Sequence, residues 1–563
     1  MNKKNVFKLL PMAAILATLG CTQGSEVTGP EAVIYTNGDI LTMNKAAPTA
    51  EAVVVVGEEI VGVGSLVDLK KEWNNFTLFD LEGKTLMPGL VETHHHIMME
   101  AAMMDFLDMS YQAEPDFDKM MDIFATGKPL PEDNHFMPGW VIGLGWDAGK
   151  HGRVPTLEER DALFPDTPVF VAMQGHGGWY NSKGMALKGI TQDKEPPRDS
   201  AYVKDENGEL TGEISGLYAV LEAIGSYPGP RLDTAIRATH KASSQGFTTV
   251  SEIGADNVDN LKILSEASLD ENFNVRVAVG VTNADGYLDT LKNRGDFETD
   301  KVWISQTKMW LDGAVHGGNI YTDLEYQNDA YKDNKLQPWG TQALFNEVAW
   351  NSLENGVNYS FHANGNLSLK MGLNAVEYAR NRAKAEGIDD SNFKGQAIHL
   401  SVSTPEQYVR MAELGVDPTF IIGHTYWAGG QIMNQYFLEH AQDYMFRVNT
   451  AFEQGLPVAL HNDAPVTPAL PWLGIETAVT RVTEDGNVLN FSEAITVQQA
   501  LEAYTINGAI QFGVEDMTGS LESGKRADMI VIDRNPLKVD PKEIRDTQVE
   551  TTIFEGRVVY ERS

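Results

Sequence analysis

The sequence contains little cysteine and far fewer basic than acidic residues, and both features exclude classes of protein. Cys21 is the single cysteine in 563 residues, which rules out an internal disulfide and a cysteine-based zinc site. There are 44 Lys and Arg residues against 79 Asp and Glu residues, giving a formal net charge of −35. Because this charge repels polyanions, it argues against binding to nucleic acid or to an anionic lipid surface. A metal site remains compatible with it, since a cation creates a local positive field inside an acidic shell.

Long apolar runs are also scarce, and the run at residues 9–20 is too short to span a bilayer comfortably. It follows three lysines and no acidic residue, so residues 1–20 are typical of a signal peptide. The segment before Cys21 resembles a bacterial lipoprotein cleavage site, with Thr18 where Leu is usual. We expect a lipid on Cys21 and a flexible tether over 21–31, with an ordinary secretory peptide as the alternative. The expected location is the bacterial cell envelope, with membrane contact only through this anchor and the membrane face left open.

Both ends of the chain have the character of short β-strands. Runs rich in β-branched residues occupy 32–36, 52–56, 527–532 and 551–560. Neither end is long enough to bury a core by itself. We therefore predict one small composite β-sandwich, made of residues 32–88 plus 518–563.

Between these ends, apolar strands alternate with amphipathic helical stretches, a pattern typical of a parallel α/β fold. Seven candidate strands cover 247–252, 275–281, 306–311, 357–362, 397–400, 419–423 and 457–460. The strand before His94 makes eight, the number that a (β/α)8 TIM barrel needs. Several of them end in His, Lys or Asp, on the side where barrel active sites are built. The sequence therefore predicts a TIM-barrel domain over residues 89–517.

One βα unit is far longer than the usual ~30 residues. The next strand after His96 begins near Phe247, so residues of about 105–235 are predicted to be an insertion after the first barrel strand. This insertion is rich in glycine and aromatic residues, which suits a lid or a pocket wall.

The triplet His94-His95-His96 is the strongest chemical signal in the chain. On a strand, residues i and i+2 face the same side, so His94 and His96 present two imidazoles together while His95 points away. A histidine-rich triplet also occurs in packed or solvated clusters. The apolar strand and the Pro-Gly pair before it favour a metal site.

Four further candidate ligands stand at later strand ends: Lys308, His362, His399 and Asp463. Lys308 is flanked by apolar and aromatic residues, where loss of solvation favours the neutral amine, which is nucleophilic toward carbon dioxide. Each residue has a simpler interpretation: a surface lysine, hydrogen-bonded core histidines and an aspartate that forms a turn. The joint arrangement favours a shared metal centre.

The chain resembles the amidohydrolase superfamily, specifically the amidohydrolase-3 group that includes formamide deformylase-like metal-dependent hydrolases. The resemblance runs from about residue 32 to the C-terminus. Besides the histidine triplet, it is carried by 176–182, 308–313, 362–365, 463–466, 501–507 and 519–528. The last of these segments is highly specific to the superfamily.

The resemblance implies a binuclear zinc site at the mouth of a distorted TIM barrel. His94 and His96 would bind one ion and His362 and His399 the second. Lys308, carboxylated by carbon dioxide, would bridge the two ions as a carbamate. Asp463 would bind a metal and hold the proton of the hydrolytic water. Imidazole and oxygen ligands suit zinc, whose borderline softness accepts both.

Several positions depart from the family pattern. Asn364 and Asn366 replace residues of a His-Ala-Ile-Gly-Asp segment, and Ile398 replaces an acid before the fourth histidine. His461-Asn462 stands where Gly-Ser is common, and His316 stands where a small residue is usual. None of these removes a proposed ligand, but they alter the residues that support the ligands, so substrate assignments do not transfer.

The predicted activity is hydrolysis of a non-peptide, amide-like carbon–nitrogen bond in a small molecule by zinc-activated water, with Asp463 as the proton carrier. Candidate substrate contacts are His176, His316, Trp310, His424 and Trp427. Trp310, Trp427 and Trp179 either line an apolar pocket or belong to the core. A deaminase, lactamase or esterase on the same site, and a non-catalytic solute-binding lipoprotein, are the alternatives. The sequence leaves a homodimer open.

Overall fold

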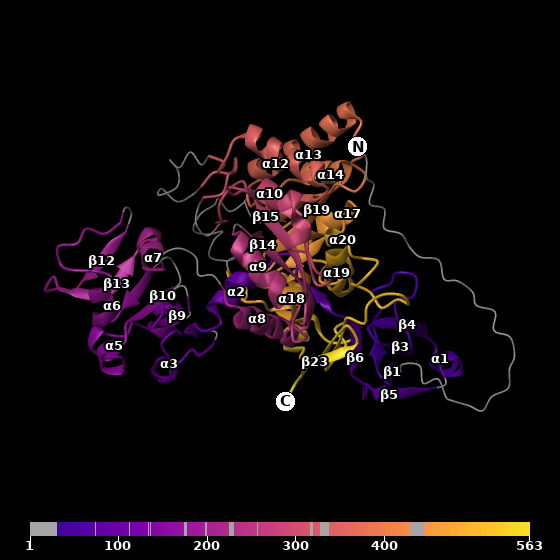
Figure 1. The fold of residues 1–563 in the computed structure, drawn as a ribbon, viewed down its shortest axis with the longest axis horizontal. Coiled ribbons are helices and arrows are strands. Elements are labelled where there is room, and N and C mark those ends of the chain that lie inside the picture. Colours follow the sequence, from indigo (N-terminus) through magenta and orange to yellow (C-terminus); the bar gives the residue numbers. More distant parts are fainter. Residues whose placement is uncertain are drawn as a thin grey trace.

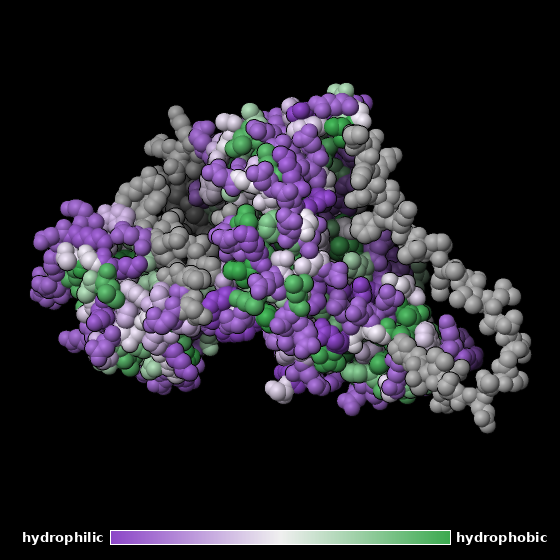
Figure 2. All heavy atoms as spheres, viewed as in Figure 1, coloured by the Kyte–Doolittle hydropathy of each residue, from purple (hydrophilic) through white to green (hydrophobic). Residues whose placement is uncertain are grey.

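The computed structural model describes residues 31–563 apart from the segments 74, 112, 133, 135–136, 174–176, 198–199, 225–229, 256, 316–318, 327–336, 428 and 430–443. The predicted signal peptide and the predicted lipid attachment site Cys21 lie outside the described residues. Within the described ranges, no helix combines the length and the apolar character that crossing a membrane requires. Figure 2 shows hydrophilic residues over most of the visible face, with hydrophobic residues in small patches.

The centre of the molecule is a curled sheet of eight parallel strands (Figure 1), which confirms the predicted mixed α/β fold. In spatial order the strands are β7 (Leu90–Val91), β14 (Phe247–Ala255), β15 (Arg276–Thr282), β16 (Val302–Trp310), β17 (Asn358–Ala363), β18 (Gly395–His399), β19 (Val416–Ile421) and β20 (Ala459–His461). Backbone hydrogen bonds link the two outer strands just beyond their ends, from His96 N to Ala464 O at 2.8 Å and from Asp463 N to His94 O at 3.1 Å. The curl therefore brings the first and last strands together.

Helices follow the strands and share their core. They are α2 (Ile97–Met103), α8 (Leu232–Ser244), α9 (Val258–Ala267), α10 (Tyr287–Lys292), α12 (Gln342–Glu354), α13 (Asn366–Glu386), α14 (Pro405–Leu414), α15 (Gly423–Trp427), α17 (Val448–Glu453), α18 (Pro471–Thr480), α19 (Val497–Ala503) and α20 (Ile506–Phe512), with the short η1 (Arg294–Asp296) and η4 (Phe491–Glu493). Local signals fix their limits: Pro405 opens α14 after a Thr404–Gln407 capping box, and Gly387 ends α13 with φ 69°. Val277, Phe345 and Leu373 belong to the large buried cluster that these elements share.

The long segment after β7 forms a sheet of its own. Its strands, in spatial order, are β12 (Ala201–Lys204), β13 (Leu210–Ser215), β11 (Gly177–Tyr180), β10 (Val169–Met173), β9 (Val141–Trp146) and β8 (Leu107–Asp108). The accompanying helices are α3 (Phe117–Ala125), α4 (Ala148–His151), α5 (Leu157–Leu163), α6 (Ser182–Leu187) and α7 (Leu217–Ile224). Figure 1 shows this unit at the left, beside α2 and α8. Trp179 is fully buried here against Trp146, with ring centroids 6.0 Å apart, so it belongs to the core of this unit.

Strands from the two chain ends pack together in two further sheets. One contains β4 (Glu59–Gly64), β3 (Ala52–Val56), β1 (Ala32–Thr36) and β5 (Phe76–Asp80), with α1 (Leu66–Glu72) nearby. The other contains β2 (Asp39–Ile40), β6 (Thr85–Pro88), β21 (Met529–Ile532), β22 (Val549–Phe554) and β23 (Arg557–Glu561), with η5 (Pro541–Asp546) before β22. Val53, Leu86 and Met529 share one buried cluster, so residues from both chain ends build a common core.

A buried arginine ties the central sheet to the terminal strands. Arg276 of β15 is 1% exposed, and its guanidinium lies 3.0 Å from Glu555 Oε1 and 3.4 Å from Asp528 Oδ2. The guanidinium carbon also lies 4.8 Å from the centre of the Phe554 ring. This contact holds the β21–β23 strands against the wall of the central sheet.

Candidate metal centre

His94 and His96 follow β7 and share one carboxylate oxygen. The Nε2 atoms of His94 and His96 lie 3.2 and 3.3 Å from Asp463 Oδ1. A charge-assisted hydrogen bond between such groups is shorter, about 2.7–2.9 Å. Two ligands bound at about 2.0–2.1 Å to one tetrahedral ion are about 3.3 Å apart. The spacing therefore fits two imidazoles and a carboxylate around a single ion.

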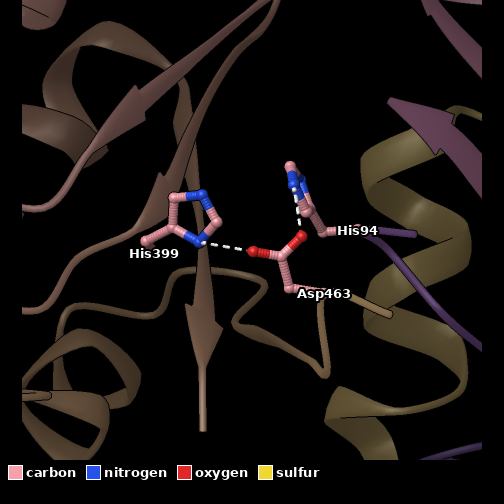
Figure 3. Close-up of side chains that lie close together, drawn as sticks. All are labelled: His94, His399 and Asp463. Carbon is pink, nitrogen blue, oxygen red and sulfur yellow. Dashed lines mark ion pairs between the residues drawn. The ribbon is translucent and has the colours of Figure 1, made fainter. Parts of the chain in front are cut away.

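His399 approaches the same carboxylate from the opposite side, with His362 next to it. Figure 3 shows the Asp463 side chain between His94 and His399, and its Oδ2 lies 3.9 Å from His399 Nδ1. His94, His399 and Asp463 each offer a ligand atom within 4.8 Å of the others. The ring of His362 follows at 4.2 Å from that of His399, measured between centroids. The structure thus brings three imidazoles to one aspartate and places a fourth, that of His362, beside His399.

Two of these residues have an uncommon backbone conformation. His399 has φ 80° and Asp463 has φ 64°, in the left-handed region that residues with a side chain rarely adopt. Each stands where a strand ends, and the turn directs its side chain toward the other histidines. Such local strain persists where the surrounding structure enforces it and is concentrated at functional sites.

Lys308 lies on β16 and is completely buried. In the described part of the chain, no group forms a hydrogen bond with its Nζ atom. Burial lowers the pKa of the Lys308 amine to about 7, so a large fraction is neutral at physiological pH. After burial, the charge of Lys308 is the next cause that lowers the pKa of His94 and of His362, which indicates that it faces the cluster. A buried amine without a partner fits a group that acquires one from outside the chain.

The protonation states suit metal binding. Burial lowers the pKa of His94 and His399 well below the ordinary value and that of His362 to about 3, which leaves neutral rings with a free lone pair. Burial alone would raise the pKa of Asp463, but the nearby His94 and His96 hold it well below its usual range. The cluster therefore offers neutral imidazoles and an ionised carboxylate, which is a set of ligands that zinc accepts.

Supporting residues that the sequence did not single out orient His362. Its Nε2 lies 2.9 Å from the Gly313 carbonyl oxygen, which assigns the ring proton to Nε2 and leaves Nδ1 for a metal. The Asn364 amide lies against the same Nε2 at 2.9 Å. Asp312, fully buried, accepts hydrogen bonds from the backbone N of Asn364 and Gly365 at 2.9 and 2.8 Å. The only advance signal was that Asn364 departs from the family pattern.

Other buried carboxylates hold the histidine strand in place. Glu92 accepts a hydrogen bond from the Asn462 side-chain amide at 2.6 Å and so connects the first strand with the last. His95 lies apart from the cluster, with Nε2 2.8 Å from Glu100 of α2. Lys241 of α8 lies 2.7 Å from the other oxygen of Glu100. The middle histidine of the triplet therefore has a structural partner of its own.

The predicted substrate contacts fall into three groups. Trp310 lines a cavity of about 160 Å³ beside His96, together with Met98, Met99, Glu252, Gly254, Ala255, Asn260 and Leu261. His424 is buried on α15, and Trp427 is half-buried at the end of the same helix. His176 and His316 lie outside the described residues.

The fold and the cluster can now be compared with known proteins. A model of the amidohydrolase family matches residues 77–560. The chain belongs to this family. It is therefore an amidohydrolase, a metal-dependent hydrolase acting on carbon–nitrogen bonds, as the sequence predicts, and its buried His and Asp cluster has ligand atoms that could hold a metal ion.

The amidohydrolase has relatives that span nearly its whole length. N-substituted formamide deformylase of Arthrobacter pascens is 25% identical over 550 residues, covering 94% of this chain and 98% of the relative. The Bacillus subtilis protein YtcJ is 27% identical over 555 residues, covering 94% and 99%. The crystal structure of an uncharacterized metal-dependent hydrolase from Pyrococcus horikoshii OT3 has a TM-score of 0.71 at 22% identity, covering 91% of this chain and 99% of that one. This structural likeness shows that the fold is shared.

Proposed function

We propose that this amidohydrolase cleaves an N-substituted, non-peptide amide of a small molecule at a centre of two zinc ions. His94, His96 and Asp463 would hold one ion, and His362 and His399 the other, with Lys308 as a carbamate between them. The observation that carries the proposal is the carboxylate of Asp463, which lies within 3.3 Å of two imidazoles on one side and 3.9 Å from a third on the other.

The chemistry that bound divalent ions supply here is to acidify water and to polarise the scissile carbonyl. The chain's own residues position the substrate and move a proton. Asp463 accepts a proton from the attacking water and donates it to the nitrogen of the leaving amine. Water thus adds across the bond, and the products are a carboxylic acid and a free amine. His424 is proposed to contact the substrate, because it lies buried one turn from Trp427 at the rim of the cluster.

The cavity beside His96 supports an apolar substituent on the substrate. Met98, Met99 and Trp310 give it an apolar wall, and at about 160 Å³ it holds a small group only. It adjoins a proposed ligand, so a group bound there lies next to the reacting bond. The name of the Arthrobacter relative, an N-substituted formamide deformylase, points to the same class of bond.

The decisive experiment is Asp463→Asn, tested on a panel of N-substituted amides. We expect the rate to fall by about a hundredfold to ten-thousandfold, the usual contribution of a proton carrier, while the metal remains bound. Asp417→Asn is the matched control, because Asp417 is a buried carboxylate on β19 whose charged neighbour is Lys394, 3.8 Å away. Full activity in Asp463→Asn would remove its proposed role.

The same panel separates the other chemistries. Release of ammonia without a new carboxylate would indicate a deaminase, and turnover of lactams or esters alone would indicate ring opening or ester cleavage. Less than one zinc per chain after gentle purification, with no activity on added metal, would favour a solute-binding protein. Mass spectrometry of the native protein tests for the carbon dioxide adduct on Lys308. Labelling with a lipid precursor, in wild type and in Cys21→Ser, tests the proposed envelope anchor.

A further inference from the structure

His461 is a buried histidine inside the ligand cluster that has no assigned role. It ends β20, two residues before Asp463, and is completely buried. Its ring centroid lies 4.9 Å from that of His94 and 5.1 Å from that of His399. His461 therefore lies between the two sides of the proposed metal centre.

Both ring nitrogens of His461 lack a hydrogen-bond partner among the residues that the structure describes. An imidazole carries at least one N–H group, and the remaining nitrogen has a lone pair or a second proton. Leaving such groups buried and unpaired is costly, so native proteins rarely do so. A ring with two unsatisfied nitrogens beside four other histidines needs a partner that is not part of the chain.

The ring spacing agrees with a shared ion. Imidazoles bound through nitrogens at about 2.0–2.1 Å to one tetrahedral ion have centroids about 5 Å apart. The pair His94–His96, which the proposed function assigns to one ion, is separated by 5.2 Å. The distances from His461 to His94 and His399 lie within the same range. Rings packed in a core lie about 4.5–7 Å apart as well. What distinguishes His461 is that both of its nitrogens lack a partner among the described residues.

We propose that His461 is a fifth imidazole ligand of the metal centre. The proposal rests on the metal-dependent function above but concerns a position where the family commonly has glycine. An extra neutral imidazole adds a strong donor without adding charge, so it tightens metal binding and raises the coordination number of the ion that it reaches.

The first test measures metal affinity. Zn²⁺ affinity, determined by competition with a chelator, is compared in wild type, His461→Asn, His461→Phe and His424→Asn. We expect affinity to fall at least about tenfold in both His461 variants. His424→Asn, which removes another buried histidine near the cluster, is the matched control and should lose much less. Equal affinity in wild type and the His461 variants, or equal losses in the control, would overturn the proposal.

The second test uses the unmodified protein and does not depend on how a variant folds. Proton NMR of the Co²⁺-loaded wild type should show hyperfine-shifted exchangeable signals from five imidazoles, whereas four would contradict the proposal. If the wild type binds no metal at all, the proposed function fails. If it binds metal with four imidazoles only, the proposed function stands and His461 is not a ligand.

Discussion

Single residues decide the chemistry of this site, and Lys308 is the most informative of them. It is fully buried, its Nζ has no hydrogen-bond partner in the described part of the chain, and its pKa is lowered to about 7 by burial. Such a residue destabilises the empty protein, because a charged or unpaired amine is costly in the interior. This cost is the reason to expect a functional role for Lys308.

Lys308→Met should therefore separate stability from activity. Without metal, the variant should be more stable than wild type by about 1–3 kcal/mol, because an unpaired polar group is replaced by an apolar one of similar length. Activity should be lost, and the metal content should fall below that of wild type. Urea denaturation in the presence of a chelator, together with metal analysis, tests both expectations. A less stable, active variant would show that Lys308 has a structural role.

Trp310→Ala tests the pocket beside His96. Removing the indole enlarges the cavity and removes its apolar wall. We expect kcat/KM to fall by about 10- to 200-fold for amides with a small apolar N-substituent and to change little for unsubstituted ones. Steady-state kinetics on a matched pair of substrates measures this ratio. Equal losses on both would indicate that Trp310 supports the ligands instead of binding the substituent.

At the scale of elements, most of what the sequence predicted concerned the strands of the central sheet and the residues at their ends. All eight strands of the central sheet were recognised as short apolar runs that alternate with amphipathic helical stretches, the pattern of a parallel α/β fold. The candidate ligands were expected to meet because strand ends in such sheets converge. Asp312 and Asn364 were missed because their role depends on contacts between separate loops. His461 was noted only as a departure, since sequence spacing does not reveal which way its ring faces.

Strand β19 offers a test of pH dependence away from the metal. Asp417 is buried, and burial raises the pKa of its carboxyl to about 7. The charge of Lys394, 3.8 Å away, lowers this pKa and so offsets part of the effect of burial. Because the folded pKa exceeds the unfolded value of about 3.9, the folded state binds the proton more tightly. Stability should therefore fall as the pH rises from about 4 to 7, by up to roughly 4 kcal/mol from this group.

Asp417→Asn should remove that dependence. We expect the variant to unfold at a higher urea concentration than wild type at pH 8 and at a similar one at pH 4.5. Urea titrations at several pH values measure the difference. A variant that is less stable than wild type at pH 8 would show that the Asp417–Lys394 ion pair outweighs the cost of burial.

At the scale of the whole molecule, Arg276 joins two parts that are distant in sequence. Arg276→Met leaves the buried Asp528 and Glu555 without their cation, which should cost about 3–5 kcal/mol. Urea denaturation measures this loss, and addition of Asp528→Asn and Glu555→Gln should restore part of it. The metal content of the folded protein should not change. A loss below about 1 kcal/mol would mean that packing alone holds the terminal sheet in place.

The pairing of β6 with β21 has a consequence for how this protein is made. β6 contains Leu86 and Met87, both completely buried, and its antiparallel neighbour comes from residues 529–532. A growing chain therefore carries an uncovered apolar edge from an early stage of translation until almost the last codons have been read. Such an edge is open to pairing with another chain. We therefore expect a stalled or shortened chain, which lacks β21, to aggregate.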